Sequence, residues 1–230
     1  MTVVNLSLSE IHDLALEAFT QNGCDPQNAG ALTRTVVAAE RDGSHSHGLF
    51  RVPGYVASLR SGKVNGAADP QISNKSPVIV NANGDDGYAP LAIERGIPAL
   101  AKAASEFGIA VMTLTHTHHF AALWPEVEAL AEQNLAGMAC VSYMPNVAPH
   151  GSNKPLFGTN PLAFAWPRKN KPPFVFDMAT SAMAGGDVAI AARDGQSVPL
   201  GTGLDENGNE TTDPAAILRG VLLPFGGHKG

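Results

Sequence analysis

Two short clusters of histidines are the residues in this sequence most suited to chemistry. The segments SHSHG at 44–48 and HTHH at 116–119 hold five of the eight histidines. Histidine changes its charge near neutral pH, so it serves as a proton donor, a proton acceptor or a metal ligand. The clusters therefore have to be weighed as metal sites and as acid–base sites.

Each cluster contains an H-x-H pair, His45 with His47 and His116 with His118. This spacing can chelate zinc from a strand. No cysteine or further histidine stands at a familiar ligand offset, however, and the HExxH motif is absent. We therefore predict no metal site.

The acid–base interpretation rests on Ser46, His47 and Arg51, which stand at the start of a predicted helix. Residues four apart share a helix face, so imidazole and guanidinium would point into one small volume. An arginine fork grips a carboxylate through two bonds, and a neighbouring imidazole can protonate the atom attached to the next carbon. In the alternative, Ser46 caps the helix, His47 lies on the surface and Arg51 pairs with an acid. Spacing alone leaves both open.

Anion-binding motifs of the common kinds are missing. No GxGxxG follows a predicted strand, and GxxxxGK[ST] is absent, so Rossmann and P-loop folds have no support. Residues 119–123 nevertheless lie between a predicted strand and a predicted helix, where backbone N–H groups can face an anion. The glycine-rich end, 224–230, offers open backbone beside the cation of Lys229.

Composition bounds the remaining choices. The 230 residues are 44 % hydrophobic and 16 % charged, which is typical of a globular protein of one large or two small domains. The net charge of −6 comes with no run of Lys and Arg, so we expect no nucleic-acid partner. There is no apolar stretch of the ~18 residues that a membrane span needs, and no signal peptide is recognisable. Cys24 and Cys140 form no CxxC pair, as expected of reduced thiols in the cytoplasm.

The elements that must position these residues fall into two parts. The capping box Ser7-x-x-Glu10 and the Asp25-Pro26 pair each predict the start of a helix, and a third helix is expected over 49–60. We therefore predict a helical N-terminal domain over 1–70 and a second domain over 71–230.

The second part alternates apolar strand patterns with helical ones. This pattern predicts an α/β fold, with a mixed sheet and flanking helices behind the N-terminal helical part. The expected segments are turn-rich residues at 69–76, a tight turn at 83–87, strands at 77–80, 109–114, 136–143, 162–166 and 174–177, and helices at 89–107, 125–133, 181–193 and from Asp213-Pro214 to Gly220.

Six motifs then occur in a recognisable order: SHSHGLFRVPGY, HTHHFAALW, LFGTNPLAFAWP, VFDMATSAMAGGDV, PLGTGLDENGNETTDP and LPFGGHKG. Together they resemble the non-Rossmann malate/L-lactate dehydrogenase superfamily, and within it the Δ1-piperideine-2-carboxylate/Δ1-pyrroline-2-carboxylate reductases. The resemblance implies NADPH as cofactor, with NADH possible, in a fold that needs no GxGxxG. It also implies a homodimer acting on a small-molecule carboxylate, and the two cysteines and the lack of a recognisable signal peptide lead us to expect a cytoplasmic location.

The activity that the resemblance implies is reduction of a cyclic imine 2-carboxylate to L-pipecolate or L-proline. A 2-oxo acid reductase of the malate or lactate type would use the same machinery, and pocket shape alone separates the two. Two rivals come from other classes: a metal-dependent hydrolase built on the His clusters, and an inactive binding protein.

The same resemblance assigns roles by residue. His47 matches the proton donor, Ser46 its relay, and Asp187 the acid that completes the relay. Arg51 matches the arginine that binds the substrate carboxylate, and Thr159 a substrate contact. The residues that match cofactor-binding segments are His119, Phe120, Ala121, Ala122, Leu123, Asp177, Met178, Ala179, His228 and Lys229.

The sequence departs from the family pattern in two places. Gly185-Gly186 stands where the family usually has a larger residue before a single glycine, and adjacent glycines loosen a helix by ~1 kcal/mol each relative to alanine. The family also continues well beyond GGHKG, whereas this sequence stops at Gly230. We therefore expect a C-terminally truncated enzyme whose N-terminal helices lack part of their packing surface.

Overall fold

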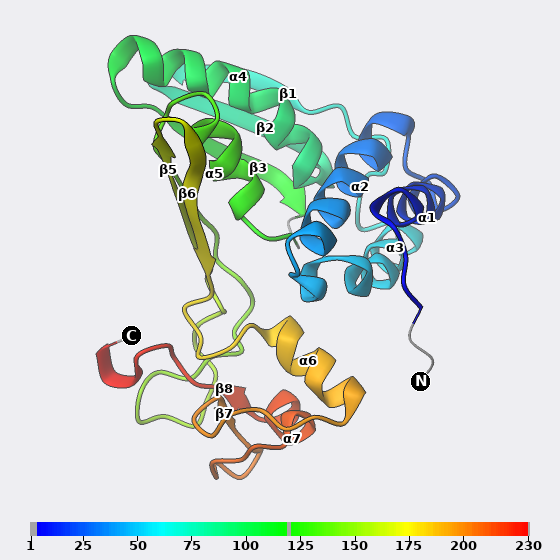
Figure 1. Cartoon of the computed structure of the whole chain (residues 1–230), viewed down its shortest axis with the longest axis vertical. Helices are drawn as coiled ribbons and strands as arrows, with labels where there is room; N and C mark the ends of the chain where they lie inside the picture. The colour runs from blue at the N-terminus through cyan, green and yellow to red at the C-terminus, as the bar shows by residue number, and fades with distance from the viewer. Residues whose placement is uncertain (1–3, 119–120, 230) are drawn as a thin grey trace.

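The computed structural model describes residues 4–118 and 121–229. It begins with three helices, α1 (Leu8–Thr20), α2 (Pro26–Arg41) and α3 (Val52–Arg60), with the short 3-10 turns η1 (His45–His47) and η2 (Leu49–Arg51) before α3. These helices form one side of the molecule, from which the remaining chain extends (Figure 1).

Local capping starts the first two helices where the sequence predicts. The Ser7 hydroxyl accepts from the Glu10 N–H at 3.2 Å, and the Glu10 carboxylate accepts in return from the Ser7 N–H at 2.8 Å. Asp25 caps α2 by accepting from the Asn28 N–H at 2.8 Å. Each cap satisfies N–H groups that the first turn of a helix leaves without partners. Both predicted helix starts are confirmed.

An aromatic stack joins these helices to the first sheet. The rings of Phe19, Tyr55 and Tyr88 meet edge to face, with centroids 5.9 and 5.1 Å apart. The Tyr88 hydroxyl also donates to the Tyr55 carbonyl at 2.7 Å. Since Tyr88 closes a strand of the sheet, the buried core of the helices continues into the α/β part. The domain division at residue 70 stays a prediction.

The first sheet has the order β1-β2-β3 and is mixed, as predicted. β1 (Gln71–Ser76) runs antiparallel to β2 (Ile79–Tyr88), and β2 runs parallel to β3 (Val111–His118). Helix α4 (Ala89–Phe107) connects the parallel strands β2 and β3 and packs on the sheet (Figure 1). Neighbouring parallel strands need such a long crossover connection, and a helix usually provides it.

Two predictions about this sheet are wrong. Residues 69–76 are not a turn, because Gln71–Ser76 forms an edge strand that leaves most of its polar side chains in water. Residues 83–87 are not a turn that ends the strand. β2 continues to Tyr88 through an irregularity in its register, where Asp85 and Asp86 take left-handed φ angles of 53° and 56°. Tertiary pairing with β3 on either side keeps this segment within the sheet.

The second sheet is antiparallel, with β4 (Gly137–Cys140), β5 (Leu162–Arg168) and β6 (Lys171–Met178) in that order. Helix α5 (Trp124–Ala131) covers one face of it. The inward positions of β5 are Ala163 and Ala165, both fully buried, so the helix approaches the sheet closely.

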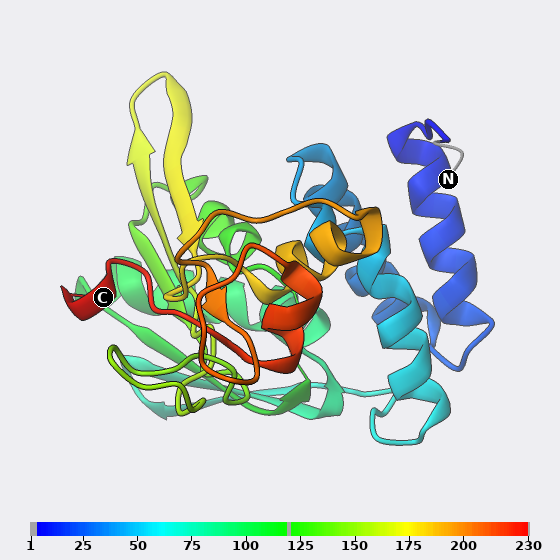
Figure 2. The ribbon, with the colours of Figure 1, turned by 90° about the horizontal axis from the view of Figure 1, so that it is seen from below.

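The C-terminal part forms a small lobe below the sheets (Figures 1 and 2). It contains α6 (Gly185–Asp194), α7 (Pro214–Arg219), the two-stranded pair β7 (Gly203–Leu204) and β8 (Val221–Leu222), and the 3-10 turn η3 (Gly227–Lys229). Helix α6 begins at Gly185 and not at 181 as predicted. Ser181 instead bridges to Pro224 in extended backbone, and its hydroxyl donates to the Met183 carbonyl at 2.7 Å.

Within residues 4–118 and 121–229, no helix is both long enough and apolar enough to cross a membrane.

The two cysteines are free thiols in different surroundings, which predicts different reactivity. Cys24 is buried, and this burial, with the nearby Asp25 charge, raises the pKa of its thiol to about 11. Cys140 is exposed. Because the thiolate is the reactive form, at pH 8 a thiol reagent such as Ellman's reagent should modify about one thiol per folded chain and the second only after unfolding. Cys140→Ser should abolish the modification of the folded chain. Modification of the folded variant would contradict the assignment of the reactive thiol to Cys140.

Candidate active site

The turn that carries His47 is fixed by a carboxylate at the end of α2. Glu40 accepts from the Leu49 N–H at 2.7 Å and contacts the Nδ1 of His45 at 2.7 Å, with 13 % of its side chain exposed. Gly48 packs directly against the Glu40 carboxylate, so a Cβ at this position would collide with it. Glu40 thus fixes the turn through its contacts with Leu49 and His45, a role that no spacing rule in the sequence indicates.

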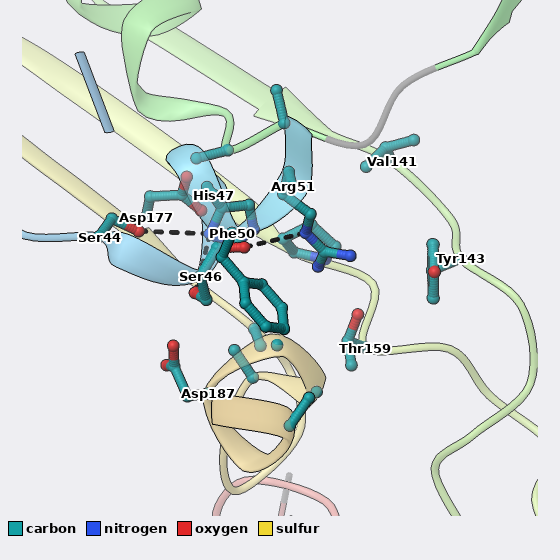
Figure 3. Close-up of a pocket in the computed structure, with 18 of the residues that line it drawn as sticks. Ser44, Ser46, His47, Phe50, Arg51, Val141, Tyr143, Thr159, Asp177 and Asp187 are labelled. Carbon is teal, nitrogen blue, oxygen red and sulfur yellow. Dashed lines mark hydrogen bonds between the residues drawn. The ribbon is translucent and has the colours of Figure 1, made fainter. Parts of the chain in front are cut away.

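His47 is held at one ring nitrogen by two serines. The hydroxyls of Ser44 and Ser46 both lie 3.2 Å from Nδ1, and Ser46 is buried (Figure 3). The prediction that Ser46 acts with His47 therefore has a geometric basis. Ser44 was missed, although the Ser-x-x-His spacing across a 3-10 turn could have indicated it.

Arg51 points into the same space from the next turn. Its Nε donates to the Ser46 carbonyl at 2.9 Å, which fixes the guanidinium relative to the His47 turn (Figure 3). The two side chains come from consecutive 3-10 turns and not from one α-helix as expected. Both side chains still line one pocket, because only Gly48 separates the two 3-10 turns.

The pocket has a volume of about 410 Å³, within the range of small-molecule sites. Its walls come from six separate stretches of the chain and from Leu218. The predicted site residues that line it are Ser46, His47, Arg51, Thr159, Asp187, Ala121, Ala122, Asp177 and Ala179, and other lining residues include Ser44, Phe50, Trp124, Val141, Ser142, Tyr143, Asn146, Gly185 and Gly186. Figure 3 shows Thr159 and Tyr143 on the side toward which the Arg51 guanidinium extends.

The predicted cofactor residues lie partly in the pocket wall and partly away from it. Beyond the four in the wall, Leu123 is buried and Met178 is partly buried, and neither lines the pocket. His228 and Lys229 lie exposed in η3 and do not line the pocket. His119 and Phe120 fall outside the described residues.

Asp177 is an acid at the end of β6 with its carboxylate inside the protein. Its Oδ2 accepts from the N–H groups of Leu123, at 2.7 Å, and Trp124, at 3.1 Å. Burial raises the pKa of the Asp177 carboxyl above its ordinary value, while these two bonds and the charge of His47 oppose the rise. The carboxylate therefore ties β6 to the start of α5.

Asp187 stands in the first turn of α6, at the pocket wall but exposed to solvent. Between the described residues its carboxylate makes no hydrogen bond. Its predicted place in the relay with Ser46 and His47 stays a prediction.

Gly185, which departs from the family pattern, and its neighbour Gly186 differ sharply in their surroundings. A Cβ on Gly186 would lie 2.9 Å from the Ser46 Cβ and 3.2 Å from an Arg51 guanidinium nitrogen. A Cβ on Gly185 would meet only Asn146 and Leu222, at ordinary contact distances of 3.6 and 3.9 Å. Gly186 is thus needed for the close approach of α6 to the His47 turn, whereas a methyl group on Gly185 would be accommodated at ordinary contact distances.

The described residues contain no group of three or more His, Cys, Asp or Glu side chains that could hold a metal ion. His45 is paired with Glu40, and His116 is exposed at the edge of β3 with a left-handed φ of 52°.

Comparison with known proteins identifies the family of the chain. The family model for malate/L-lactate dehydrogenase matches residues 6–230. The chain belongs to the malate/L-lactate dehydrogenase family. This membership implies a nicotinamide cofactor, and it agrees with the resemblance found in the six motifs.

Within the malate/L-lactate dehydrogenase family, the chain is 50 % identical to a Δ1-pyrroline-2-carboxylate/Δ1-piperideine-2-carboxylate reductase of Pseudomonas putida, over 100 % of this chain and 67 % of that protein. It superposes on Δ1-piperideine-2-carboxylate reductase from Pseudomonas syringae with a TM-score of 0.92 and 46 % identity, over 99 % of this chain and 69 % of that one. Sulfolactate dehydrogenase from Methanocaldococcus jannaschii gives 0.85 and 31 %, over 97 % and 65 %. The chain thus spans about two thirds of the length of these relatives.

The paired glycines give a direct test of the close approach. Gly186→Ala should force α6 away from Ser46 and Arg51, and we expect destabilisation of about 1–3 kcal/mol with loss of ligand binding in the pocket. Gly185→Ala is the matched control and should change the free energy of unfolding by less than about 1 kcal/mol. Chemical denaturation of both variants measures the difference, and equal effects would show that the two positions are equivalent.

Proposed function

We propose that the chain reduces a cyclic imine 2-carboxylate, of the Δ1-piperideine-2-carboxylate or Δ1-pyrroline-2-carboxylate type, to the corresponding L-amino acid. The observation that carries the proposal is the juxtaposition of His47 and Arg51 at one pocket, with both side chains fixed through Ser46. Reductases with 43–50 % identity to the chain are named for these substrates.

The substrate carboxylate is assigned to Arg51. Its Nε is occupied by the Ser46 carbonyl, so the remaining guanidinium nitrogens face the pocket, where Thr159 stands opposite (Figure 3). A guanidinium offers paired N–H groups that match a carboxylate. With the carboxylate held there, the adjoining C=N group would lie in the same cavity as His47.

His47 would supply the proton. Reduction of C=N needs two electrons and a proton at carbon and a second proton at nitrogen. Because Ser44 and Ser46 engage Nδ1, the transferable proton belongs on Nε2. The imidazolium gives this proton to the ring nitrogen and becomes neutral imidazole, which solvent can reprotonate.

The pocket also fits a nicotinamide ring. Ala121, Ala122 and Ala179 form a wall of small apolar side chains, and His47 and Arg51 lie in the same cavity. When bound, the reduced nicotinamide supplies the hydride to the imine carbon and is left oxidised. Preference for NADPH over NADH, a homodimeric assembly and a cytoplasmic location stay predictions.

A panel of cyclic imine 2-carboxylates and 2-oxo acids, each with NADPH and NADH, tests the proposed function through absorbance at the nicotinamide band. We expect the highest kcat/KM with a cyclic imine carboxylate. The family also contains enzymes named for 2-hydroxy acids, such as sulfolactate dehydrogenase, so a higher value with a 2-oxo acid would overturn the substrate assignment. Activity that disappears with a chelator would instead favour a metal-dependent enzyme.

Replacing His47 separates chemistry from binding. His47→Gln should lower kcat by at least about 100-fold, since general acid catalysis contributes 10²–10⁴. The dissociation constant for NADPH, measured by fluorescence titration, should change by less than about threefold. Turnover that stays near that of the unmodified chain would rule out His47 as the proton donor.

Replacing Arg51 tests the carboxylate contact. Arg51→Met keeps much of the side-chain length but removes the charge, and we expect KM for the carboxylate substrate to rise about 10- to 100-fold. Arg51→Lys keeps the charge without the fork and should recover only part of the loss. A substrate lacking the carboxylate serves as the control, because its KM should not respond to either substitution. An unchanged KM for the carboxylate substrate would show that the carboxylate binds at a residue other than Arg51.

A further inference from the structure

Asp177 presents one carboxylate oxygen to the pocket. Both hydrogen bonds from the start of α5, from the N–H groups of Leu123 and Trp124, go to Oδ2. Oδ1 makes no hydrogen bond with any residue in the described ranges. It is not among the buried unpartnered atoms either, and Asp177 lines the pocket. Oδ1 is therefore open to the cavity.

His47 lies next to this carboxylate. Figure 3 shows Asp177 beside the imidazole, on the side where Ser44 contacts Nδ1. The charges of the two side chains interact, and a protonated His47 favours the ionised Asp177. This attraction must act equally in the other direction, because an interaction between two charges stabilises the charged form of both.

The other acid at the pocket is less able to do this. Asp187 is exposed in the first turn of α6, where water screens its charge. Asp177 is half-buried and anchored by two backbone N–H groups, so its position is fixed and its field on His47 is screened less.

We propose that Asp177 is a positioning residue for His47. Its carboxylate lies beside the imidazole, orients the ring and stabilises its protonated form. The same side chain accepts the hydrogen bonds that fix the start of α5, which forms part of the pocket wall. The proposal rests on the proposed function in that it assigns the proton to His47. It adds an acid that the sequence resemblance places only in a cofactor-binding segment.

Other charged groups face this pair from each neighbouring element. The cation of Arg51 opposes protonation of His47, and Asp187 across the pocket supports it. Glu126 on α5 acts on Asp177 by repulsion, and Asp42 is engaged with Arg41 and with the Trp124 indole N–H at 3.0 Å. His45 and Glu40 pair with each other on the far side of the turn. Asp177 is the acid among these that is both half-buried and open to the pocket beside His47.

The consequence concerns pH. A proton donor works only while it is protonated, so activity falls as pH rises through the His47 titration. An anion beside His47 delays this fall to higher pH. Removing the anion should therefore move the alkaline limb of the kcat/KM profile to lower pH.

The test replaces Asp177 with asparagine, which keeps an oxygen for the Leu123 and Trp124 N–H groups but removes the charge. We expect the alkaline limb of kcat/KM in Asp177→Asn to move about one pH unit lower. The His47 ring proton, followed by NMR in the chain without substrate or cofactor and assigned with His47→Gln, should show the same shift. Asp177→Glu, which retains the charge, should restore most of it.

Asp187→Asn is measured in parallel. A larger shift in this variant than in Asp177→Asn would overturn the proposal and assign the role to Asp187. A change confined to NADPH affinity, with both titrations unmoved in Asp177→Asn, would also overturn it and leave Asp177 a cofactor residue only. If Asp177→Asn does not fold, Asp177→Ser carries the same measurements and the same expectation.

The NMR titration distinguishes this proposal from the proposed function. It needs neither substrate nor turnover, so it reports on Asp177 and His47 even if the substrate panel fails. A normal substrate panel with an unmoved His47 titration would reject Asp177 alone.

Discussion

The close approach of α6 to the His47 turn is the contact on which the site depends. Gly186 meets Ser46 and the Arg51 guanidinium at distances that leave no room for a side chain. Through this contact the C-terminal lobe closes the pocket against the N-terminal helices. A bulkier residue would separate the wall that carries Asp187 from the turn that carries the proposed proton donor and carboxylate ligand.

Backbone groups fix several of the charged side chains in and around the site. The Ser46 carbonyl orients Arg51, the Leu49 N–H holds Glu40, and the Leu123 N–H holds Asp177. Such bonds come from well-packed elements, so they cost little extra ordering when a ligand binds. The site is therefore preorganised by hydrogen bonds that also stabilise the fold. Glu40 has a structural role, because it fixes the turn that carries His47.

Small side chains give the pocket its room. Alanines at 121, 122, 179, 184 and 189 and the paired glycines line its walls together with the charged groups. Small apolar side chains in one pocket with a cation and an imidazole suit a flat ring next to a small carboxylate.

The sequence by itself determined the starts of the first two helices, the mixed α/β class and the motif order that indicates the family. These features depend on residues close together, such as the capping pairs at Ser7 and Asp25, or on the succession of motifs. Only the tertiary structure decided that 71–76 is a strand, that β2 continues through Asp85, and that Asp177 shares a pocket with His47. Strand pairing and the approach of distant carboxylates depend on packing between elements, which spacing along one chain does not encode.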